Sequence, residues 1–375
     1  LHSYIVIWLP ENIIIDKLVG VNMTKIAIIG GSQSGRTVLA SKLGKKGNVT
    51  DIAIYDFSKS GKTLVSIDAT GYPKSVKPLI TALNLSDIAL LCIPPTGPDI
   101  HTGECIVALD LLGYRHGMVV LTMSDTSHHH ALEEMTESLR KIAAGTVLED
   151  WEYIPVSTST FDGMEELKER IFSMGGQVDQ ENAELNELSP RVVIDHVFNV
   201  TGIGCVILGM VMQGTIHAKD KMGVLPAGRQ VEIRSIQMHD VDAKSAPAGA
   251  RVGLALKNIQ PKDVERGCVI SNIEAVNTGF TLNCTLSKFA KRISVGDMLH
   301  LFVGLQTAPL RVERIVVDGE DVDHATAGSS PVVTLSGSKN VTYIESDRFI
   351  LTNLDEKQRF VGYGFCESAI PESPR

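Results

Sequence analysis

Residues 30–37 have the types and spacing of a loop that holds phosphate groups. They read GGSQSGRT, which fits the pattern G-x4-G-K-[ST] except that Arg36 stands at the lysine position. Gly30 and Gly35 allow a tight turn, and the next backbone amides would point at phosphate oxygens at the positive end of a helix. The hydroxyl of Thr37 would ligate magnesium. The residues expected to bind a nucleotide here are Gly30, Gln33, Ser34, Gly35, Arg36 and Thr37.

Arginine at position 36 changes what such a loop can do. Lysine brings a slim point charge to the β and γ phosphates, whereas a guanidinium is a broad planar fork that cannot take the same space without displacement. We therefore expect weakened nucleotide binding and still weaker hydrolysis. The alternative is that Arg36 forms a salt bridge and does not touch phosphate.

Two further motifs follow in the order that a GTP-binding domain requires. Asp68 and Gly71 form a D-x-x-G motif after the apolar run at 64–67. The acid would hold magnesium through water, and the glycine amide would sense the γ phosphate. Asp125 follows the run at 118–121, where GTP-binding proteins carry N-K-x-D, and its carboxylate would accept two hydrogen bonds from guanine. The alternative for Asp125 is a loop residue that only turns the chain.

The remaining nucleotide contacts are expected from three residues. Thr122 opens the segment that ends at Asp125, although Met123 lacks the ammonium of the usual lysine. Ser157 and Thr158 precede a helical run, and backbone amides there would face the guanine oxygen. The alternative for Ser157 and Thr158 is a plain turn with a serine cap.

The elements that must position these residues alternate between strand-like and helical runs from residue 24 to 172. This alternation predicts a mostly parallel sheet with helices on both faces. Polar residues 173–189 are interpreted as a linker, and the short β-rich runs after them predict barrels. The expected units are 1–22, an extension that is disordered or translated from upstream; 23–172, an α/β P-loop domain; 173–189, the linker; and 190–274 and 275–370, two all-β barrel domains.

Composition limits the class of protein. Hydrophobic residues make up 43% and charged residues 21% of the 375 residues, as in ordinary globular proteins. No run reaches the roughly 18 to 20 apolar residues that a membrane span needs, so we expect no membrane partner. The six cysteines form no C-x-x-C pair, which predicts neither a zinc site nor disulfides and favours the cytoplasm. A net charge of −9 argues against a generally basic nucleic-acid surface, while Lys288, Lys291 and Arg292 form a local basic cluster.

With these motifs in this order, the chain resembles translational GTPases, and most closely the SelB-type, selenocysteine-specific branch of the elongation factor Tu superfamily. The resemblance covers residues 24–365 and is most specific at 194–270, including the lead-in at 195–198 and the hairpin at 225–228. It implies a GTPase domain before two barrels, GTP or GDP with Mg²⁺ as cofactors, and aminoacyl-tRNA and the ribosome as partners of a monomeric cytoplasmic factor. By family analogy, the terminal adenosine of the tRNA lies near Asp195, His196, Phe198 and Val200.

The departures from that family cluster around hydrolysis. Tyr72 stands at the position of the catalytic histidine, and a phenol, whose pKa is ordinarily about 10, cannot activate water in the same way. Thr50 is the counterpart of the switch threonine and would join Thr37 and Asp68 as a magnesium ligand. Only twelve residues separate Thr37 from Thr50, so the first switch loop is nearly missing and switching should be blunted.

We therefore expect a SelB-like elongation factor that binds GTP or GDP and an aminoacyl-tRNA for delivery to the ribosome, with weak or no GTP hydrolysis. The alternative is a pseudo-GTPase that acts as an RNA-, ribosome- or protein-binding regulator without nucleotide turnover. The residues alone do not identify the aminoacyl-tRNA, and they leave open whether GTP is hydrolysed and whether an exchange factor is needed.

Overall fold

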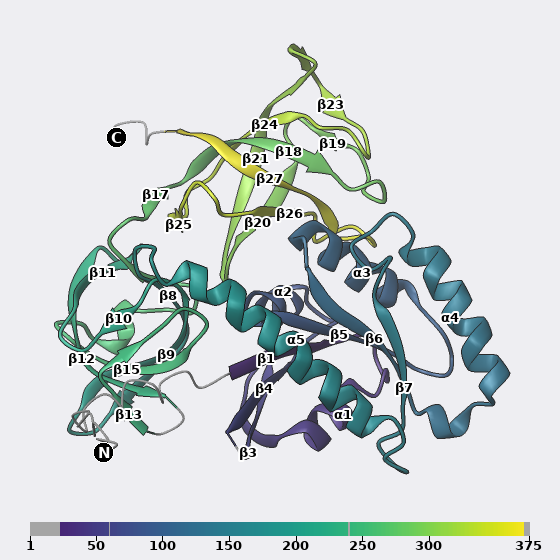
Figure 1. Ribbon diagram of the computed structural model, residues 1–375. Coiled ribbons are helices and arrows are strands. Elements are labelled where there is room, and N and C mark those ends of the chain that lie inside the picture. The colour runs from purple at the N-terminus through teal and green to yellow at the C-terminus, as the bar shows by residue number, and fades with distance from the viewer. Residues whose placement is uncertain (1–22, 60, 239–240, 371–375) are drawn as a thin grey trace, which may run out of the picture.

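The computed structural model describes residues 23–59, 61–238 and 241–370. The extension predicted at residues 1–22 lies outside the described residues. Figure 1 shows an α/β unit beside two separate barrels, with the long helix α5 (Met164–Leu185) running toward the first barrel. Within the described ranges, no helix has both the length and the apolar character that a membrane crossing demands.

The α/β unit is built on a seven-stranded sheet with the strand order β2-β3-β4-β1-β5-β6-β7. Strand β1 pairs in parallel with β4 and β5, and the parallel pairing continues through β6 to β7. Strands β2 and β3 form an antiparallel edge. The strands are β1 (Met23–Ile29), β2 (Lys45–Val49), β3 (Ala53–Lys59), β4 (Lys62–Asp68), β5 (Ile88–Ile93), β6 (His116–Thr122) and β7 (Glu152–Val156).

Helices cover both faces of this sheet because its central strand is apolar on both sides. Ile26 and Ile28 of β1 pack with α1 and α5, whereas Ala27 and Ile29 pack with α2 and α3, as the alternation of side chains along a strand requires. The other helices are α1 (Arg36–Leu43), α2 (Lys77–Asn84), α3 (Ile100–Leu112), η3 (Ser124–Thr126) and α4 (His129–Ala143).

Helix α5 continues through most of the segment that we interpreted as a linker. Residues 173–185 are helical, so this part of the segment interpreted as a linker is a continuation of α5. The physical reason is a buried stripe at helical spacing, formed by Ile171, Gly175 and Val178. Gly175 lets the helix approach β1 closely, since a Cβ atom there would lie 2.2 Å from Oγ1 of Thr24.

The first barrel closes with six strands in the order β11-β16-β8-β9-β15-β12, because β12 also pairs with β11. Strand β13 extends this sheet beside β12, and β10 pairs separately with β14. The elements are β8 (Arg191–Val200), β9 (Gly204–Gln213), β10 (Ile216–His217), β11 (Lys221–Leu225), β12 (Arg229–Met238), β13 (Val241–Ala243), β14 (Ser245–Ala246), β15 (Arg251–Lys257), η4 (Pro261–Asp263) and β16 (Val269–Ser271).

The second barrel repeats this plan with the order β20-β26-β27-β18-β24-β21, closed by pairing of β20 with β21. Its strands are β17 (Ala275–Asn277), β18 (Gly279–Leu286), β19 (Ile293–Ser294), β20 (Met298–Val303), β21 (Gln306–Val317), β22 (Glu320–Val322), β23 (His324–Ala325), β24 (Val332–Ser336), β25 (Val341–Tyr343), β26 (Phe349–Thr352) and β27 (Phe360–Ile370). The predicted fold class, a mostly parallel α/β domain followed by two all-β barrels, is confirmed.

Buried ion pairs join the two barrels. The guanidinium of Arg191 in β8 donates two hydrogen bonds to the carboxylate of Asp347, at 2.7 and 2.6 Å. Its Nε atom lies 2.6 Å from Oε1 of Glu274. Burial acts to lower the pKa of Arg191, but the two carboxylates raise it above its usual value, so the charge is held in place.

Candidate functional site

The loop between β1 and α1 keeps its backbone amides available for an anion. Gly30 and Gly35 have φ values of 151° and 79°, which permit the sharp turn into the helix. The amides of residues 33–37 donate to no acceptor in the part of the chain that the structure describes. The buried hydroxyl of Ser34 also lacks a partner there. This arrangement is typical of a phosphate-binding loop at a helix N-terminus.

Arg36 turns its side chain onto protein groups. One terminal nitrogen donates to the carbonyl oxygen of Gly30 at 2.5 Å, and the other donates to the carbonyl oxygen of Tyr72. The Nε atom lies 3.2 Å from Oδ1 of Asp68. Arg36 therefore makes the salt bridge that the alternative interpretation anticipated, and all three guanidinium nitrogens have partners.

One carboxylate oxygen of Asp68 accepts a hydrogen bond, and the other faces a cation. Thr37 donates from Oγ1 to Oδ2 of Asp68 at 2.6 Å, while Arg36 faces Oδ1. Asp68 is fully buried, and this burial raises its pKa above the usual value although Thr37 and Arg36 act in the opposite direction. The structure thus brings together two of the three residues expected to hold magnesium.

The third residue, Thr50, lies against the first barrel instead. Its Oγ1 atom donates to Oδ1 of Asp51 at 3.0 Å and accepts from Arg266 at 3.1 Å. Arg266 also donates to Oδ1 of Asp51 at 2.7 Å. The backbone amide of Gly71, which was expected to sense a γ phosphate, donates to the carbonyl oxygen of Asp51 at 2.7 Å.

Tyr72 is buried on the side of the sheet that faces α3. Its hydroxyl lies 2.8 Å from Oε2 of Glu104 and 2.9 Å from the carbonyl oxygen of His101. Arg359 of the second barrel pairs with the same carboxylate of Glu104, with nitrogen–oxygen distances of 2.8 and 2.5 Å. Burial, together with the neighbouring Cys105 and Glu104, raises the pKa of Tyr72 well above its ordinary value, so the phenol stays neutral.

Comparison with known proteins identifies the family to which this arrangement belongs. The protein family described as "Elongation factor Tu domain 2" matches residues 204–271. An uncharacterized protein of Methanocaldococcus jannaschii is 30% identical over 328 residues, which is 87% of this chain and 95% of that protein. The selenocysteine-specific elongation factor of the same organism is 25% identical over 370 residues, covering 90% of this chain and 78% of the relative. The chain belongs to the SelB and elongation factor Tu family of translational GTPases.

A solved structure supports the same assignment. SelB from Methanococcus maripaludis, in complex with the GTP analogue GppNHp, superimposes with a TM-score of 0.81 at 25% identity. The match covers 93% of this chain and 79% of that one. The resemblance to the SelB branch is therefore confirmed, and an elongation-factor-like role in translation follows from it.

The residues predicted to surround a guanine base differ from one another in burial and in hydrogen-bond partners. Thr122 is buried and donates from Oγ1 to the carbonyl oxygen of Ser34 at 2.8 Å, so its side chain supports the phosphate loop. The exposed carboxylate of Asp125 has no partner among the residues described. Ser157 is buried, and its Oγ accepts from the amides of residues 159 and 160 at 3.1 and 3.0 Å, while the neighbouring Thr158 is only half-buried. The side chain of Ser157 therefore holds the turn.

In the first barrel, the residues predicted to contact tRNA differ in how far they are exposed. Asp195 is buried and pairs with Arg251 at 2.5 Å. Burial acts to raise the pKa of Asp195, but Arg251 and His196 lower it to about 2. The rings of His196 and Phe198 stack with 6.1 Å between centroids and 2° between planes. Phe198 is 36% exposed, and Val200 ends the same strand.

A cavity separates this barrel from the α/β unit. Its volume is about 390 Å³, and Asp56 and Val65 of β3 and β4 line one side. Leu208, Gln237 and Arg251 line the side that belongs to the barrel. The space therefore lies between the two units.

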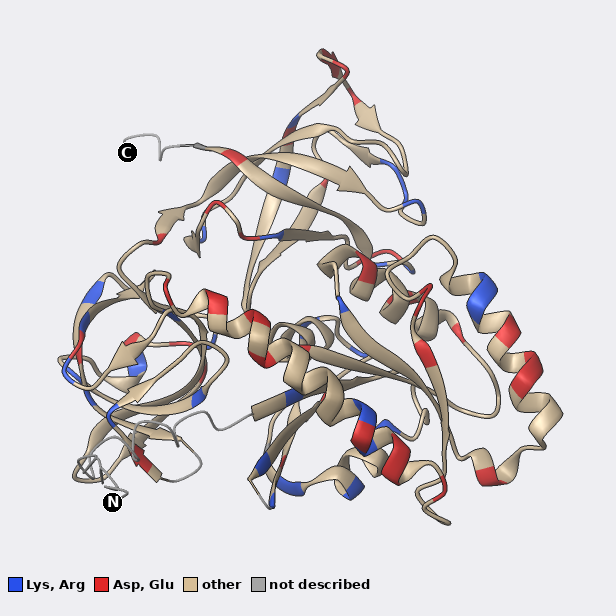
Figure 2. Cartoon of the chain, in the orientation of Figure 1, with Lys and Arg blue, Asp and Glu red and all other residues tan. Residues whose placement is uncertain are grey.

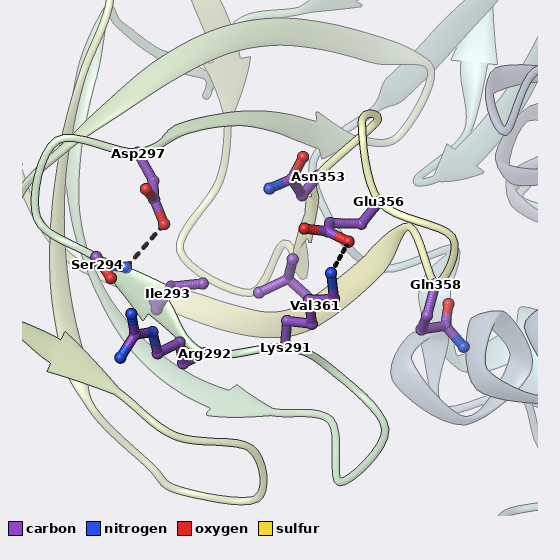
Figure 3. Close-up of a pocket in the computed structure, with 9 residues that line it drawn as sticks. All are labelled: Lys291, Arg292, Ile293, Ser294, Asp297, Asn353, Glu356, Gln358 and Val361. Carbon is purple, nitrogen blue, oxygen red and sulfur yellow. Dashed lines mark hydrogen bonds and ion pairs between the residues drawn. The ribbon is translucent and has the colours of Figure 1, made fainter.

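The basic cluster of the second barrel is partly neutralised. Figure 3 shows Lys291 paired with Glu356 beside a polar pocket of about 280 Å³ that Arg292 also lines. The Lys291–Glu356 distance is 2.5 Å. Lys288 lies 3.5 Å from the carbonyl oxygen of Ala144 at the end of α4. Figure 2 shows acidic and basic residues interspersed along α4 and α5.

Sequence reasoning missed the residues that connect the loops of the α/β unit to the barrels. These are Asp51 and Arg266 on one side, and Glu104 and Arg359 on the other. Glu104 and Arg359 stand 255 positions apart, so no local spacing signals their contact. A buried carboxylate within the apolar helix α3 was the one available sign that a distant cation had to exist.

Proposed function

We propose that the protein is an elongation-factor-like carrier that binds guanine nucleotide and an aminoacyl-tRNA in the cytoplasm, with weak or no GTP hydrolysis. The observation that carries this proposal is the position of Tyr72. The resemblance aligns Tyr72 with the family's catalytic histidine, and here its side chain is buried with the hydroxyl 2.8 Å from Oε2 of Glu104. A neutral phenol that donates its proton to a protein acceptor cannot take a proton from an attacking water.

Nucleotide binding is supported by the free amides at residues 33–37 and by the unpartnered carboxylate of Asp125. Family membership implies GTP or GDP with Mg²⁺ as the ligands. The residues fit Mg²⁺ poorly, because Asp68 is already engaged by Thr37 and Arg36 and because Thr50 bonds to Arg266. We therefore propose weakened nucleotide binding rather than its loss.

Binding of an aminoacyl-tRNA is supported by the first barrel. The stacked rings of His196 and Phe198 offer a flat surface of the kind on which a nucleobase stacks. The adjacent cavity of about 390 Å³ gives room for an amino acid beside Arg251. Delivery to the ribosome by a monomer is the proposal that follows from the family.

Two measurements test this function. Gel-shift titration of the purified chain with aminoacylated and uncharged tRNA should show a preference for the aminoacylated form. GTP turnover in the presence of ribosomes should stay near the rate of a control without protein. Equal affinity for both tRNA forms contradicts the carrier role, and rapid ribosome-stimulated turnover contradicts the loss of hydrolysis.

A second candidate is a pseudo-GTPase that binds RNA, the ribosome or a protein without nucleotide turnover. The bond from the amide of Gly71 to Asp51 favours it, because the group that should respond to a γ phosphate is already satisfied. Under this alternative, tRNA or ribosome binding is the same with GTP, with GDP and without nucleotide. A Kd that changes more than about tenfold among these three conditions contradicts it.

A further inference from the structure

The phosphate loop offers a complete position for one anionic group. The amides of residues 33–37 are unpaired among the residues described, and the side chain of Ser34 is 1% exposed with an unpartnered hydroxyl. Successive amides at a helix N-terminus bind a phosphate without help from a metal ion. These donors are the groups that a phosphate would meet in this part of the site.

The groups that would receive a further phosphate are committed to protein partners. The amide of Gly71 donates to Asp51, and the hydroxyl of Thr50 is bonded to Asp51 and Arg266. The guanidinium of Arg36 is held by the carbonyl oxygens of Gly30 and Tyr72. A third phosphate would have to break these contacts, and the buried carbonyl oxygens of Gly30 and Tyr72 would lose their partner if Arg36 turned to the phosphate.

The group that would anchor a metal ion is committed as well. A hydrated Mg²⁺ needs oxygen atoms with free lone pairs facing it. Asp68 already accepts from Thr37 at 2.6 Å, and its other oxygen faces Nε of Arg36 at 3.2 Å. Arg36 also brings a positive charge next to this carboxylate, so an added divalent cation would meet repulsion.

We propose that this loop binds a nucleoside diphosphate without a metal ion, with the Arg36–Asp68 pair in place of Mg²⁺, and that it discriminates against a triphosphate. The inference rests on the proposed binding of guanine nucleotide and names the form of nucleotide that the site accepts. Arg36 acts here as a positioning residue, because it holds Asp68 and the segment at Tyr72 rather than the phosphates.

The test is titration of the full chain with fluorescent GDP and with a fluorescent non-hydrolysable GTP analogue, each in Mg²⁺ and in EDTA. We expect the Kd for GDP to change less than about threefold when Mg²⁺ is removed, and the GTP analogue to bind at least about tenfold more weakly than GDP. Arg36→Lys should release Asp68, because an ammonium cannot reach both carbonyl oxygens and the carboxylate. In this variant the removal of Mg²⁺ should weaken GDP binding at least about tenfold.

Arg170→Lys is the matched control, because Arg170 lies on an exposed part of α5 and, among the residues that the structure describes, pairs only with Glu152. It should behave as the unaltered chain. A strong Mg²⁺ requirement in the unaltered chain, or equal affinity for both nucleotides, overturns the inference while nucleotide binding stands. Binding of neither nucleotide overturns both, whereas the tRNA gel shift tests the carrier role independently. If Arg36→Lys does not fold, the four titrations of the unaltered chain still decide.

Discussion

Two buried aspartates, one beside the phosphate loop and one in the first barrel, differ in how closely an arginine pairs with them and in the direction of their pKa shifts. Asp195 of the barrel pairs with Arg251 at 2.5 Å, and its pKa falls to about 2 despite burial. Asp68 beside the phosphate loop faces Arg36 at 3.2 Å, and burial raises its pKa. The difference arises because Arg36 directs its terminal nitrogens to the carbonyl oxygens of Gly30 and Tyr72.

This comparison indicates which part of a translational GTPase has changed its task. The barrel has a buried ion pair beside the stacked rings of His196 and Phe198, and it is the part that matches the family description at residues 204–271. Around the phosphate loop, the residues that would respond to nucleotide are bonded to each other and to both barrels. A nucleotide can shift a conformation only by binding two states differently, so bonds that hold one state reduce the shift.

The largest expected effect comes from breaking the contact between Tyr72, Glu104 and Arg359. Glu104→Gln removes the charge and leaves the guanidinium of Arg359, which is 14% exposed, without its anion. We expect the free energy of unfolding to fall by about 3 kcal/mol, as for other buried pairs that lose one partner. Urea unfolding of the full chain measures it.

The matched control for that experiment is Asp321→Asn, the same chemical change in the exposed pair with Arg314. Exposed pairs are screened by water, so this variant should unfold like the unaltered chain. Equal behaviour of the two variants would mean that Glu104 does not connect the phosphate-loop region to the second barrel.

The second effect is a loss of unfolding free energy at acid pH, which we attribute to Asp195 of the first barrel. The folded pKa of Asp195 is about 2, against 3.8 for the free carboxyl group, which corresponds to about 2 kcal/mol. Because the folded pKa is depressed, this stabilisation is present above pH 3.8 and is lost as the pH falls through about 2. Urea unfolding between pH 5 and pH 2 should show this loss in the unaltered chain. Asp195→Asn should lack this component, and identical pH curves would contradict the pairing with Arg251.

The sequence predicted the fold because its signals are periodic and local. Alternating runs indicated the parallel sheet, and apolar strands separated by turn residues indicated the two barrels, which pack as expected. The helical character of residues 173–185 was missed, because the buried stripe of Ile171, Gly175 and Val178 is short and includes a glycine. Glycine suggested a break, whereas its lack of a side chain allows close packing on Thr24.

The candidate site was predictable only in part. The D-x-x-G spacing predicted that Asp68 would lie near Thr37, and their side chains are 2.6 Å apart. The bonds from Thr50 to Arg266 and from Gly71 to Asp51 had no sequence signal, because side-chain direction and loop path decide them. These contacts between residues far apart in the sequence restrain the segments at Thr50 and Gly71.

A smaller effect should follow when the phosphate-loop region is released from the first barrel. Arg266→Ala removes the bonds to Thr50 and Asp51, and the partly buried pair should contribute about 1 kcal/mol. The amide of Gly71 should then exchange its hydrogen faster, because its acceptor is the carbonyl oxygen of Asp51. Lys339→Ala is the control, since Lys339 faces Glu265 at 3.6 Å in an exposed pair nearby. Unchanged exchange at Gly71 would show that Arg266 does not restrain this loop.

The smallest expected effect is the most informative about hydrolysis. Tyr72→His returns the family's catalytic residue, yet the imidazole would enter a pocket formed by Glu104 and the backbone at His101 rather than face the phosphates. We expect GTP turnover to rise less than about tenfold, because an oriented base contributes only when it reaches the attacking water. A rate recovered by a factor of a hundred or more would mean that Tyr72 alone had silenced the enzyme. Turnover that rises only when Arg36→Lys is added would locate the block in the loop, because this variant releases Asp68 and the carbonyl oxygen of Tyr72.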